Sequence, residues 1–206
     1  ETAAGIRTPA LLGLGYGGVA GAVAASAGST AAGTKTGPGV AVDGISGNPL
    51  GESSSVMSSP FGPRPWFKAG LHRGVDLVTS NATGARKTVY ALGSGVVEFA
   101  GFDRGGGGLY VKIRYDDGHH SSYLHLSSLG SSTGQRVSRG AAVGVTGNTG
   151  SASRGPHLHF DLFERGSSSQ RIDPLGFEPI GRTLRPDPRS VPRWKGHGWQ
   201  DPRKAN

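Results

Sequence analysis

One short segment constrains the fold of this chain more than any other, residues 155–162, with the sequence Gly-Pro-His-Leu-His-Phe-Asp-Leu. Three polar residues, His157, His159 and Asp161, alternate in it with three large apolar ones. Successive side chains of an extended chain point to opposite faces. The pattern therefore predicts a β-strand with two imidazoles and a carboxylate on one face and a core-facing surface on the other. Neighbouring imidazoles on an exposed face suit both metal binding and proton transfer.

A second motif lies upstream at residues 71–77, where His72 and Asp76 stand four residues apart around a glycine. Together with either His157 or His159 they would form a set of two nitrogen ligands and one oxygen ligand. Three protein ligands leave the fourth tetrahedral position of a zinc ion open to water, as in catalytic zinc sites. The residues alone leave open which histidine of residues 155–162 completes the set.

The remaining strands predict an all-β fold. Glycine accounts for 37 of 206 residues and hydrophobic residues for 34%, which is lean for a helical core and typical of short strands joined by tight turns. We expect a mainly antiparallel sheet with irregular N- and C-terminal arms. Asp116-Asp117-Gly118 predicts a hairpin that places His119 and His120 at a solvated tip and His125 in the following strand. The chain has no cysteine, which excludes disulfides, thiolate metal sites and a cysteine nucleophile.

Composition divides the chain into three parts. Residues 1–48 are rich in glycine and alanine and are expected to form a low-complexity linker or arm. Residues 49–180 contain the predicted strands and form the domain, and residues 181–206 form a basic tail rich in proline, arginine and tryptophan. The uncharged stretch 9–32 has too few large side chains to predict a transmembrane helix. No signal peptide is recognisable and residue 1 is Glu, so we expect the sequence to begin at a processing boundary or to be part of a longer chain.

The formal net charge of +8 is concentrated in the tail, where seven cationic residues face two acidic ones. Anionic cell-wall polymers, acidic lipid and nucleic acid all carry complementary charge. No nucleic-acid-binding motif accompanies the basic residues, so nucleic acid is the least favoured of these partners. A solvated tail without a partner is the simpler alternative.

Three spaced motifs together resemble one known family. His72-x-x-x-Asp76, Tyr123-x-His125-Leu-Ser and residues 155–160, in this order, resemble the lysostaphin/LytM-type zinc endopeptidases. Members of that family cut the peptide part of bacterial peptidoglycan. The resemblance covers roughly residues 59–177 of the sequence, including Asp173-Pro174 near its end.

The resemblance assigns roles to five residues. It makes His72, Asp76 and His159 the ligands of one Zn²⁺ ion per chain, and it makes His125 and His157 the catalytic pair beside the metal. It thereby selects His159 over His157 as the third ligand. We assign proton transfer first to His157 and stabilisation of the oxyanion to His125, with exchange of the two roles as the alternative.

Three further residues lie near these positions, and the sequence suggests alternative roles for two of them. Arg64, in the Phe-Gly-x-Arg motif, either binds a substrate carboxylate or braces its loop. Trp66 occupies a position at which some family members carry a tyrosine that helps to hold the transition state, and its indole has no hydroxyl for that purpose. Asp161 replaces the glutamate often found after His-x-His-Phe, and it either orients a histidine or faces water.

The sequence thus predicts a zinc endopeptidase that cleaves cross-links or stem peptides of peptidoglycan. The alternative from another class is a non-catalytic structural or wall-binding module that has retained the fold. We expect a location outside the cytoplasm, either as a secreted, periplasmic or wall enzyme or as part of a phage tail or tape-measure protein. In the latter setting, residues 1–48 and 181–206 would contact other tail or envelope proteins. Glycine bridges and D-alanyl cross-links are both cleaved within the family, and the sequence does not distinguish between them.

Overall fold

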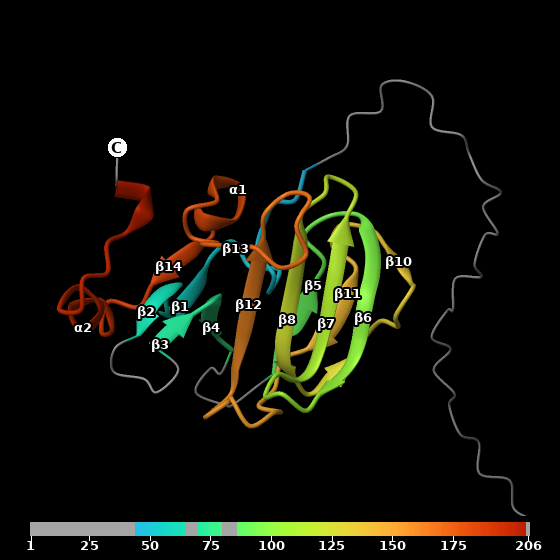
Figure 1. The fold of residues 1–206 in the computed structure, drawn as a ribbon, viewed down its shortest axis with the longest axis horizontal. Helices are drawn as coiled ribbons and strands as arrows, with labels where there is room; N and C mark the ends of the chain where they lie inside the picture. The colour runs from blue at the N-terminus through green and yellow to red at the C-terminus, as the bar shows by residue number, and fades with distance from the viewer. Residues whose placement is uncertain (1–43, 65–69, 80–85, 205–206) are drawn as a thin grey trace, which may run out of the picture. The chain divides into compact units, whose positions relative to one another are not determined.

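The His-x-His segment forms β12, a strand inside the main sheet of the molecule (Figure 1). The computed structural model describes residues 44–64, 70–79 and 86–204. The main sheet has nine strands in the order β10-β6-β7-β8-β12-β4-β1-β14, with β13 paired to β12. Its strands are β1 (Ser55–Ser59), β4 (Val75–Val78), β6 (Gly95–Asp103), β7 (Gly108–Tyr115), β8 (His120–Leu126), β10 (Arg136–Val137), β12 (His157–Phe163), β13 (Arg171–Ile172) and β14 (Leu184–Pro186).

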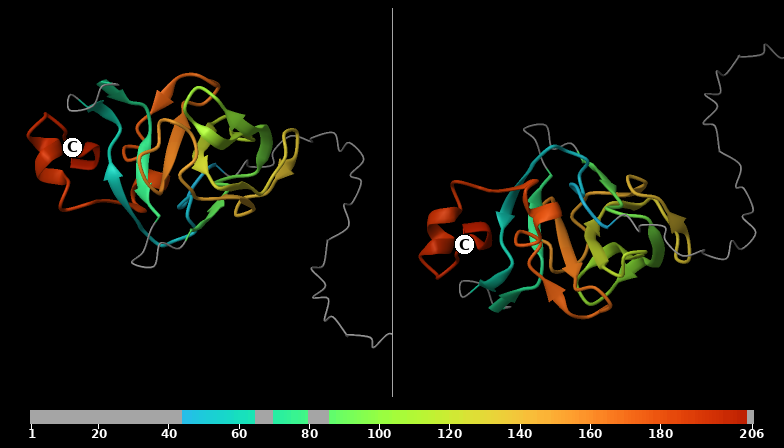
Figure 2. Two further views of the ribbon diagram at one scale, coloured as in Figure 1. Left: turned by 90° about the horizontal axis from the view of Figure 1, so that it is seen from below. Right: turned by 90° about the horizontal axis from the view of Figure 1, so that it is seen from above.

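Two smaller sheets accompany it. One contains β5 (Thr88–Tyr90), β11 (Ala142–Val145) and β9 (Ser128–Leu129), and it lies behind β6, β7 and β8 in the view of Figure 1, with two further views in Figure 2. The other is the hairpin of β2 (Gly62–Arg64) and β3 (Gly70–His72). Every strand pair is antiparallel except β1 with β14. The expected all-β, mainly antiparallel fold is confirmed.

The alternation along β12 explains its place in the sheet. Leu158, Phe160 and Leu162 are fully buried in the core, whereas His157 and His159 on the opposite face are only partly buried. Apolar side chains of β4, β7 and β8 meet this surface, including Leu77 and Tyr123. Burial of such side chains stabilises each by about 1.5–3 kcal/mol relative to exposure. The core thus fixes the register that sets β12 beside β4.

The hairpin at Asp116-Asp117-Gly118 joins β7 to β8 as expected, but its histidines do not lie at a solvated tip. His119 Nδ1 donates to the Asp117 carboxylate at 3.1 Å, and the His119 ring makes an edge contact with Phe177. His120 is 6% exposed, and its Nδ1 lies 3.0 Å from Glu98 Oε2. The expectation was wrong because both rings are covered by residues distant in sequence.

The C-terminal segment is folded onto the domain and is not an extended arm. It contains α1 (Glu178–Gly181), α2 (Val191–Lys195) and the 3₁₀ turn η1 (Pro202–Lys204), and β14 extends the main sheet at its edge. Leu184 is fully buried and Trp194 is 3% exposed. These apolar residues hold the segment despite its proline and arginine content. The structured part also continues beyond residue 180.

The packed structure also extends beyond the predicted domain boundary at its N-terminal end. Ile45 is 2% exposed, and its backbone N–H donates to the Asp117 carboxylate at 2.8 Å, so the packed structure begins before residue 49. The remainder of the expected linker, residues 1–43, lies outside the described residues. None of the described helices has the length and apolar character needed to span a membrane.

Candidate metal centre

Sheet pairing brings two of the predicted ligands face to face. His159 on β12 stands directly opposite Asp76 on β4 in the antiparallel register. His72 ends β3 and is followed by the turn that leads into β4, so it reaches the same place from the other side. His72, Asp76 and His159 each offer a ligand atom within 4.8 Å of the others, and they form the only such group of three or more among the residues described.

The three ligand atoms form a small triangle. His72 Nε2 lies 3.1 Å from Asp76 Oδ1 and 3.1 Å from His159 Nδ1, and His159 Nδ1 lies 2.9 Å from Asp76 Oδ1. Atoms bound at about 2.0–2.1 Å to a tetrahedral zinc ion would stand about 3.3 Å apart. The observed triangle is close to that size.

Hydrogen bonds on the outer sides of the rings decide which atoms carry protons. His72 Nδ1 lies 2.6 Å from the Pro60 carbonyl, which can only accept, so Nδ1 carries the proton. His159 Nε2 likewise faces the Asp161 carboxylate at 2.9 Å. In neutral rings, two lone pairs and a carboxylate oxygen therefore point at one another with no proton between them. Such an arrangement favours a bound cation, and its donor set fits Zn²⁺.

The pKa values of His159 and Asp76 also indicate that positive charge is stabilised at this position. Burial lowers the pKa of His159, but hydrogen bonds to Asp161 and Asp76 outweigh burial and raise it to about 9. Burial raises the pKa of Asp76, yet hydrogen bonds to His159 and His72 hold it well below its usual range. In the metal-free chain a proton on His159 supplies the charge that a metal ion would supply.

Asp161 orients His159 from behind and does not face water. It is 2% exposed and accepts the Nε2 proton of His159 through Oδ1. Its other oxygen lies 3.2 Å from Nε of Arg171, which comes from β13. Burial raises the pKa of Asp161, but His159 and Arg171 outweigh it and lower the value. Of the two expectations for Asp161, the structure shows the orienting one.

Arg64 contacts one of the candidate metal ligands directly. Its Nη2 lies 2.6 Å from Asp76 Oδ2, the oxygen that does not face the two histidines. Both side chains are 14% exposed. The guanidinium therefore fixes the Asp76 carboxylate so that Oδ1 alone points into the triangle. Trp66 lies outside the described residues.

The second pair of histidines stands next to this triangle. The ring centroids of His125 and His157 are 4.8 Å apart, and His157 Nε2 lies 3.6 Å from Asp76 Oδ1. His125 Nδ1 donates to the Thr149 carbonyl at 2.9 Å, and His157 Nδ1 donates to the Gly155 carbonyl at 2.8 Å. Each neutral ring therefore has its lone pair on Nε2.

His125 is held in an unusual state. Its φ of 62° lies in the left-handed region, and no other described non-glycine residue has a positive φ. Such a conformation costs about 1–3 kcal/mol and concentrates at functional sites. Burial lowers the pKa of His125 to about 4, and the Thr149 carbonyl only partly offsets this effect. The ring is consequently neutral near pH 7.

Comparison with known proteins identifies the family. Residues 70–174 match Peptidase family M23, and the match contains both histidine pairs, Asp76 and Asp161. This chain belongs to peptidase family M23.

The matches to two curated M23 relatives cover 56% and 66% of this chain. It is 38% identical over 119 residues to "Peptidoglycan DD-endopeptidase ShyA" of Vibrio cholerae, covering 56% of this chain and 26% of the relative. It is 34% identical over 144 residues to "Lysostaphin" of Staphylococcus simulans, covering 66% of this chain and 28% of the relative. The matched region thus spans only about a quarter of these relatives.

Solved M23 structures share the fold. The structure of lysostaphin from Staphylococcus simulans superposes with a TM-score of 0.56 and 30% identity, covering 71% of this chain and 60% of that one. A zinc-containing peptidase from Vibrio cholerae gives a TM-score of 0.55 at 27% identity, covering 64% of this chain and 39% of that one. These similarities agree with the mainly antiparallel sheet described above.

The sequence did not reveal all the residues of this M23 site. Arg171 is distant from the histidine motifs and reaches Asp161 only because β13 pairs with β12. Pro60 and Thr149 contribute backbone carbonyls, which no side-chain motif can signal. The glycine at position 74 was visible as part of the His-x-x-x-Asp motif, and the structure supplies its reason, since a Cβ there would collide with Asp161 and His159.

Proposed function

We propose that this M23 domain is a zinc-dependent endopeptidase that cleaves peptide bonds in bacterial peptidoglycan. The observation that carries the proposal is the convergence of His72 Nε2, His159 Nδ1 and Asp76 Oδ1 on one point, with no proton among the neutral groups. The paired imidazoles of His125 and His157 beside that point supply the second requirement of peptide hydrolysis, a group that moves protons.

Zinc held by three protein ligands supplies a water of pKa about 7 and polarises a carbonyl. His72, His159 and Asp76 would hold the ion, with Asp161 and Arg64 keeping two of these ligands in orientation. Because Asp76 Oδ2 is occupied by Arg64, the carboxylate contributes one oxygen only. The ligand set is therefore two nitrogens and one oxygen, which leaves room for water and substrate.

Proton transfer is assigned to His157. A proton acceptor works best when its pKa lies near the operating pH. The pKa of His125 is about 4, which makes that ring a poor proton acceptor near pH 7. Nε2 of His157 accepts a proton from the attacking water, and the ring then returns a proton to the leaving amine.

His125 can assist the oxyanion only in its protonated form. Its Nδ1 proton is committed to the Thr149 carbonyl, so the neutral ring has no proton on Nε2 to donate. Developing negative charge nearby would favour protonation of this ring. The role assigned to His125 therefore depends on a proton gained during the reaction.

A shallow cleft next to the centre is suited to an acidic peptide substrate. It has a volume of about 280 Å³ and is lined by Arg64, Arg154, Asp76, His157 and small residues of the 152–156 loop. Arg64 is paired with Asp76, so the two guanidinium groups and one carboxylate of the lining leave a net positive charge. Net positive charge at a cleft favours substrates that carry carboxylates. Stem peptides of peptidoglycan carry such groups, and the names of the relatives point to the same polymer.

The test is mass spectrometry of fragments released from purified peptidoglycan of several wall types. Wild-type protein with zinc should release defined peptides, and both a chelator and the His159→Ala substitution should abolish release. The masses of the new termini identify the bond that is cut. Release that persists with the chelator present would refute a zinc-dependent reaction.

The proposed setting is outside the cytoplasm, where the substrate lies. A virion-tail setting for the chain stays a prediction, which a pull-down with residues 1–48 would test by recovery of phage tail proteins. The non-catalytic alternative predicts binding to the wall without any fragment release.

A further inference from the structure

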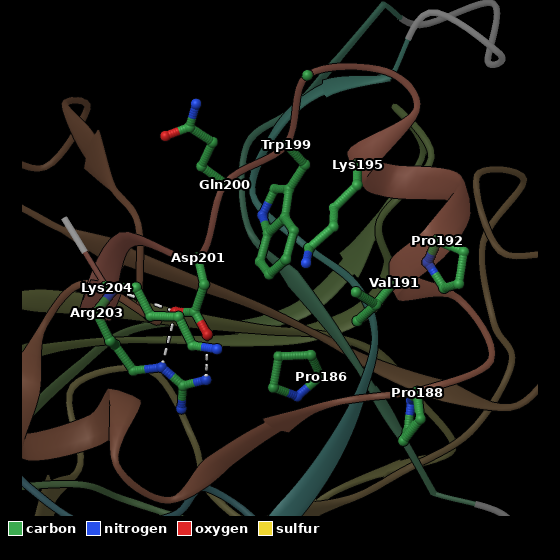
Figure 3. A pocket seen from close by; sticks show the side chains of 11 residues that line it. Pro186, Pro188, Val191, Pro192, Lys195, Trp199, Gln200, Asp201, Arg203 and Lys204 are labelled. Atoms are coloured by element: carbon green, nitrogen blue, oxygen red, sulfur yellow. Dashed lines mark hydrogen bonds and ion pairs between the residues drawn. The ribbon is translucent and has the colours of Figure 1, made fainter.

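A second cavity lies on the C-terminal segment, outside residues 70–174 that match family M23. It has a volume of about 790 Å³, larger than the cleft of about 280 Å³ beside the metal centre. Figure 3 shows its lining, which comes from the end of β14, from α2, and from η1 with the chain that leads into it. We call this cavity the C-terminal groove.

The apolar surface of the C-terminal groove consists of Val191 and several rigid rings. Trp199 presents its indole to the cavity, and Pro186 and Pro188 lie across from it (Figure 3). The indole is fixed from behind by Trp194, whose ring centroid is 5.3 Å away in an edge-on arrangement and which is itself 3% exposed. A preformed flat surface of this kind can bind a ring without loss of side-chain freedom.

Positive charge surrounds these rings. Lys195, Arg203 and Lys204 line the groove together with a single carboxylate, Asp201. Arg203 neutralises that carboxylate through two hydrogen bonds, at 2.9 and 2.7 Å. Among the described residues, no carboxylate lies within ion-pair distance of either lysine, although Lys204 contributes electrostatically to the lowered pKa of Asp201. Both lysines are exposed and available to an anionic ligand.

The fold connects the groove to the metal centre. Pro186 belongs to β14, which pairs with β1, and β1 pairs with β4, the strand that carries Asp76. Neighbouring strands lie about 4.8 Å apart, so β14 is about 10 Å from β4 across the sheet. The groove is therefore built on the edge of the same sheet that carries Asp76.

We propose that the C-terminal groove binds peptidoglycan at a position separate from the bond that is cut, an inference that rests on the proposed function. Sugar rings of the glycan strand pack against Trp199 and the prolines. Carboxylates of the attached stem peptides pair with Lys195 and Lys204. The basic tail thus retains the domain on its insoluble substrate, where a surface-bound enzyme meets many bonds without dissociating.

The test measures equilibrium binding of the full chain to insoluble peptidoglycan stripped of teichoic acids, with a chelator present to prevent cleavage. The Lys195→Gln/Lys204→Gln double variant should bind about tenfold more weakly, given the modest contribution of each exposed ion pair. The matched control is Arg86→Gln/Arg182→Gln, which removes the same charge from exposed positions outside the groove and should stay within about twofold of wild type.

A Trp199→Phe variant tests the ring surface separately, and it should also weaken binding while Trp194 stays buried. Equal binding by wild type and the double lysine variant would overturn the proposal. So would binding only to walls that retain teichoic acid, or displacement of the protein from stripped peptidoglycan by an equal mass of DNA. Failure of the wild-type protein with zinc to cleave a soluble stem peptide would instead refute the proposed function, without affecting the binding result.

Discussion

Gly74 offers the sharpest test of how the site is built. It precedes β4 and separates His72 from Asp76. A Cβ at this position would lie 2.5 Å from the Phe160 carbonyl oxygen, 2.6 Å from Asp161 Oδ1 and 2.9 Å from His159 Nε2. The first of these neighbours is backbone of β12 and cannot rotate away. The other two are the hydrogen-bonded atoms that orient a ligand ring.

The Gly74→Ala substitution should therefore act on stability and on metal binding together. Overpacking of this kind costs about 1–3 kcal/mol of unfolding free energy. Displacement of the pair formed by Asp161 and His159 should weaken zinc binding by about 10- to 100-fold, as for other residues that orient metal ligands. Urea unfolding of the metal-free protein measures the first effect, and competition with a zinc-binding dye measures the second.

Gly155→Ala is the matched control, because nothing lies within 4 Å of a Cβ at that glycine. It should leave both quantities close to wild type. Neither glycine has a φ in the left-handed region, so backbone strain does not distinguish them. If Gly74→Ala proves as stable as Gly155→Ala and binds zinc as tightly, the argument that β12 and the His72–Asp76 segment touch at this glycine is wrong.

Three further predictions follow from the pKa values and hydrogen bonds. The folded-state pKa of His159 is raised from 6.5 to about 9. The metal-free protein should therefore be most stable below pH 6.5, and its free energy of unfolding should fall by up to about 3 kcal/mol as the pH rises through 9. The zinc-saturated protein should not show this fall, and urea unfolding at pH 6 and pH 10 compares the two forms. Replacing His125 or His157 by alanine should lower turnover by about 10²- to 10⁴-fold while one zinc per chain stays bound by metal analysis, and unchanged turnover would exclude the assigned roles. Tyr115→Phe should cost about 1–3 kcal/mol in thermal unfolding, since it leaves the buried Tyr123 hydroxyl without the partner now 2.6 Å away, and a neutral effect would mean that another group satisfies that hydroxyl.

The sequence predicted the parts of the structure that depend on local pattern. Strict alternation of polar and apolar residues was enough to place β12 and to separate its buried face, with Leu158 and Phe160, from its histidine face. The spacing of His72 and Asp76 indicated a ligand pair, and the family resemblance completed it with His159. These features lie within short segments, where side-chain direction follows from strand geometry.

Features that depend on distant pairing were not predicted. Arg171 meets Asp161 through the register of β12 and β13, and the left-handed backbone of His125 has no signature in its neighbours. The C-terminal segment was expected to be an extended arm because proline and arginine dominate its composition. Burial of Leu184 and Trp194 outweighs that composition and folds the segment onto the edge of the sheet.

The most direct test of the account is a zinc titration in which binding and cleavage are followed in the same sample. Metal-free protein should be inactive, and release of peptides from peptidoglycan should rise with added zinc and level off at one equivalent per chain. The His159→Ala variant should neither bind that equivalent tightly nor gain activity. Full cleavage by the metal-free protein, or tight binding of one equivalent by His159→Ala, would contradict the claim that His72, Asp76 and His159 hold the catalytic ion.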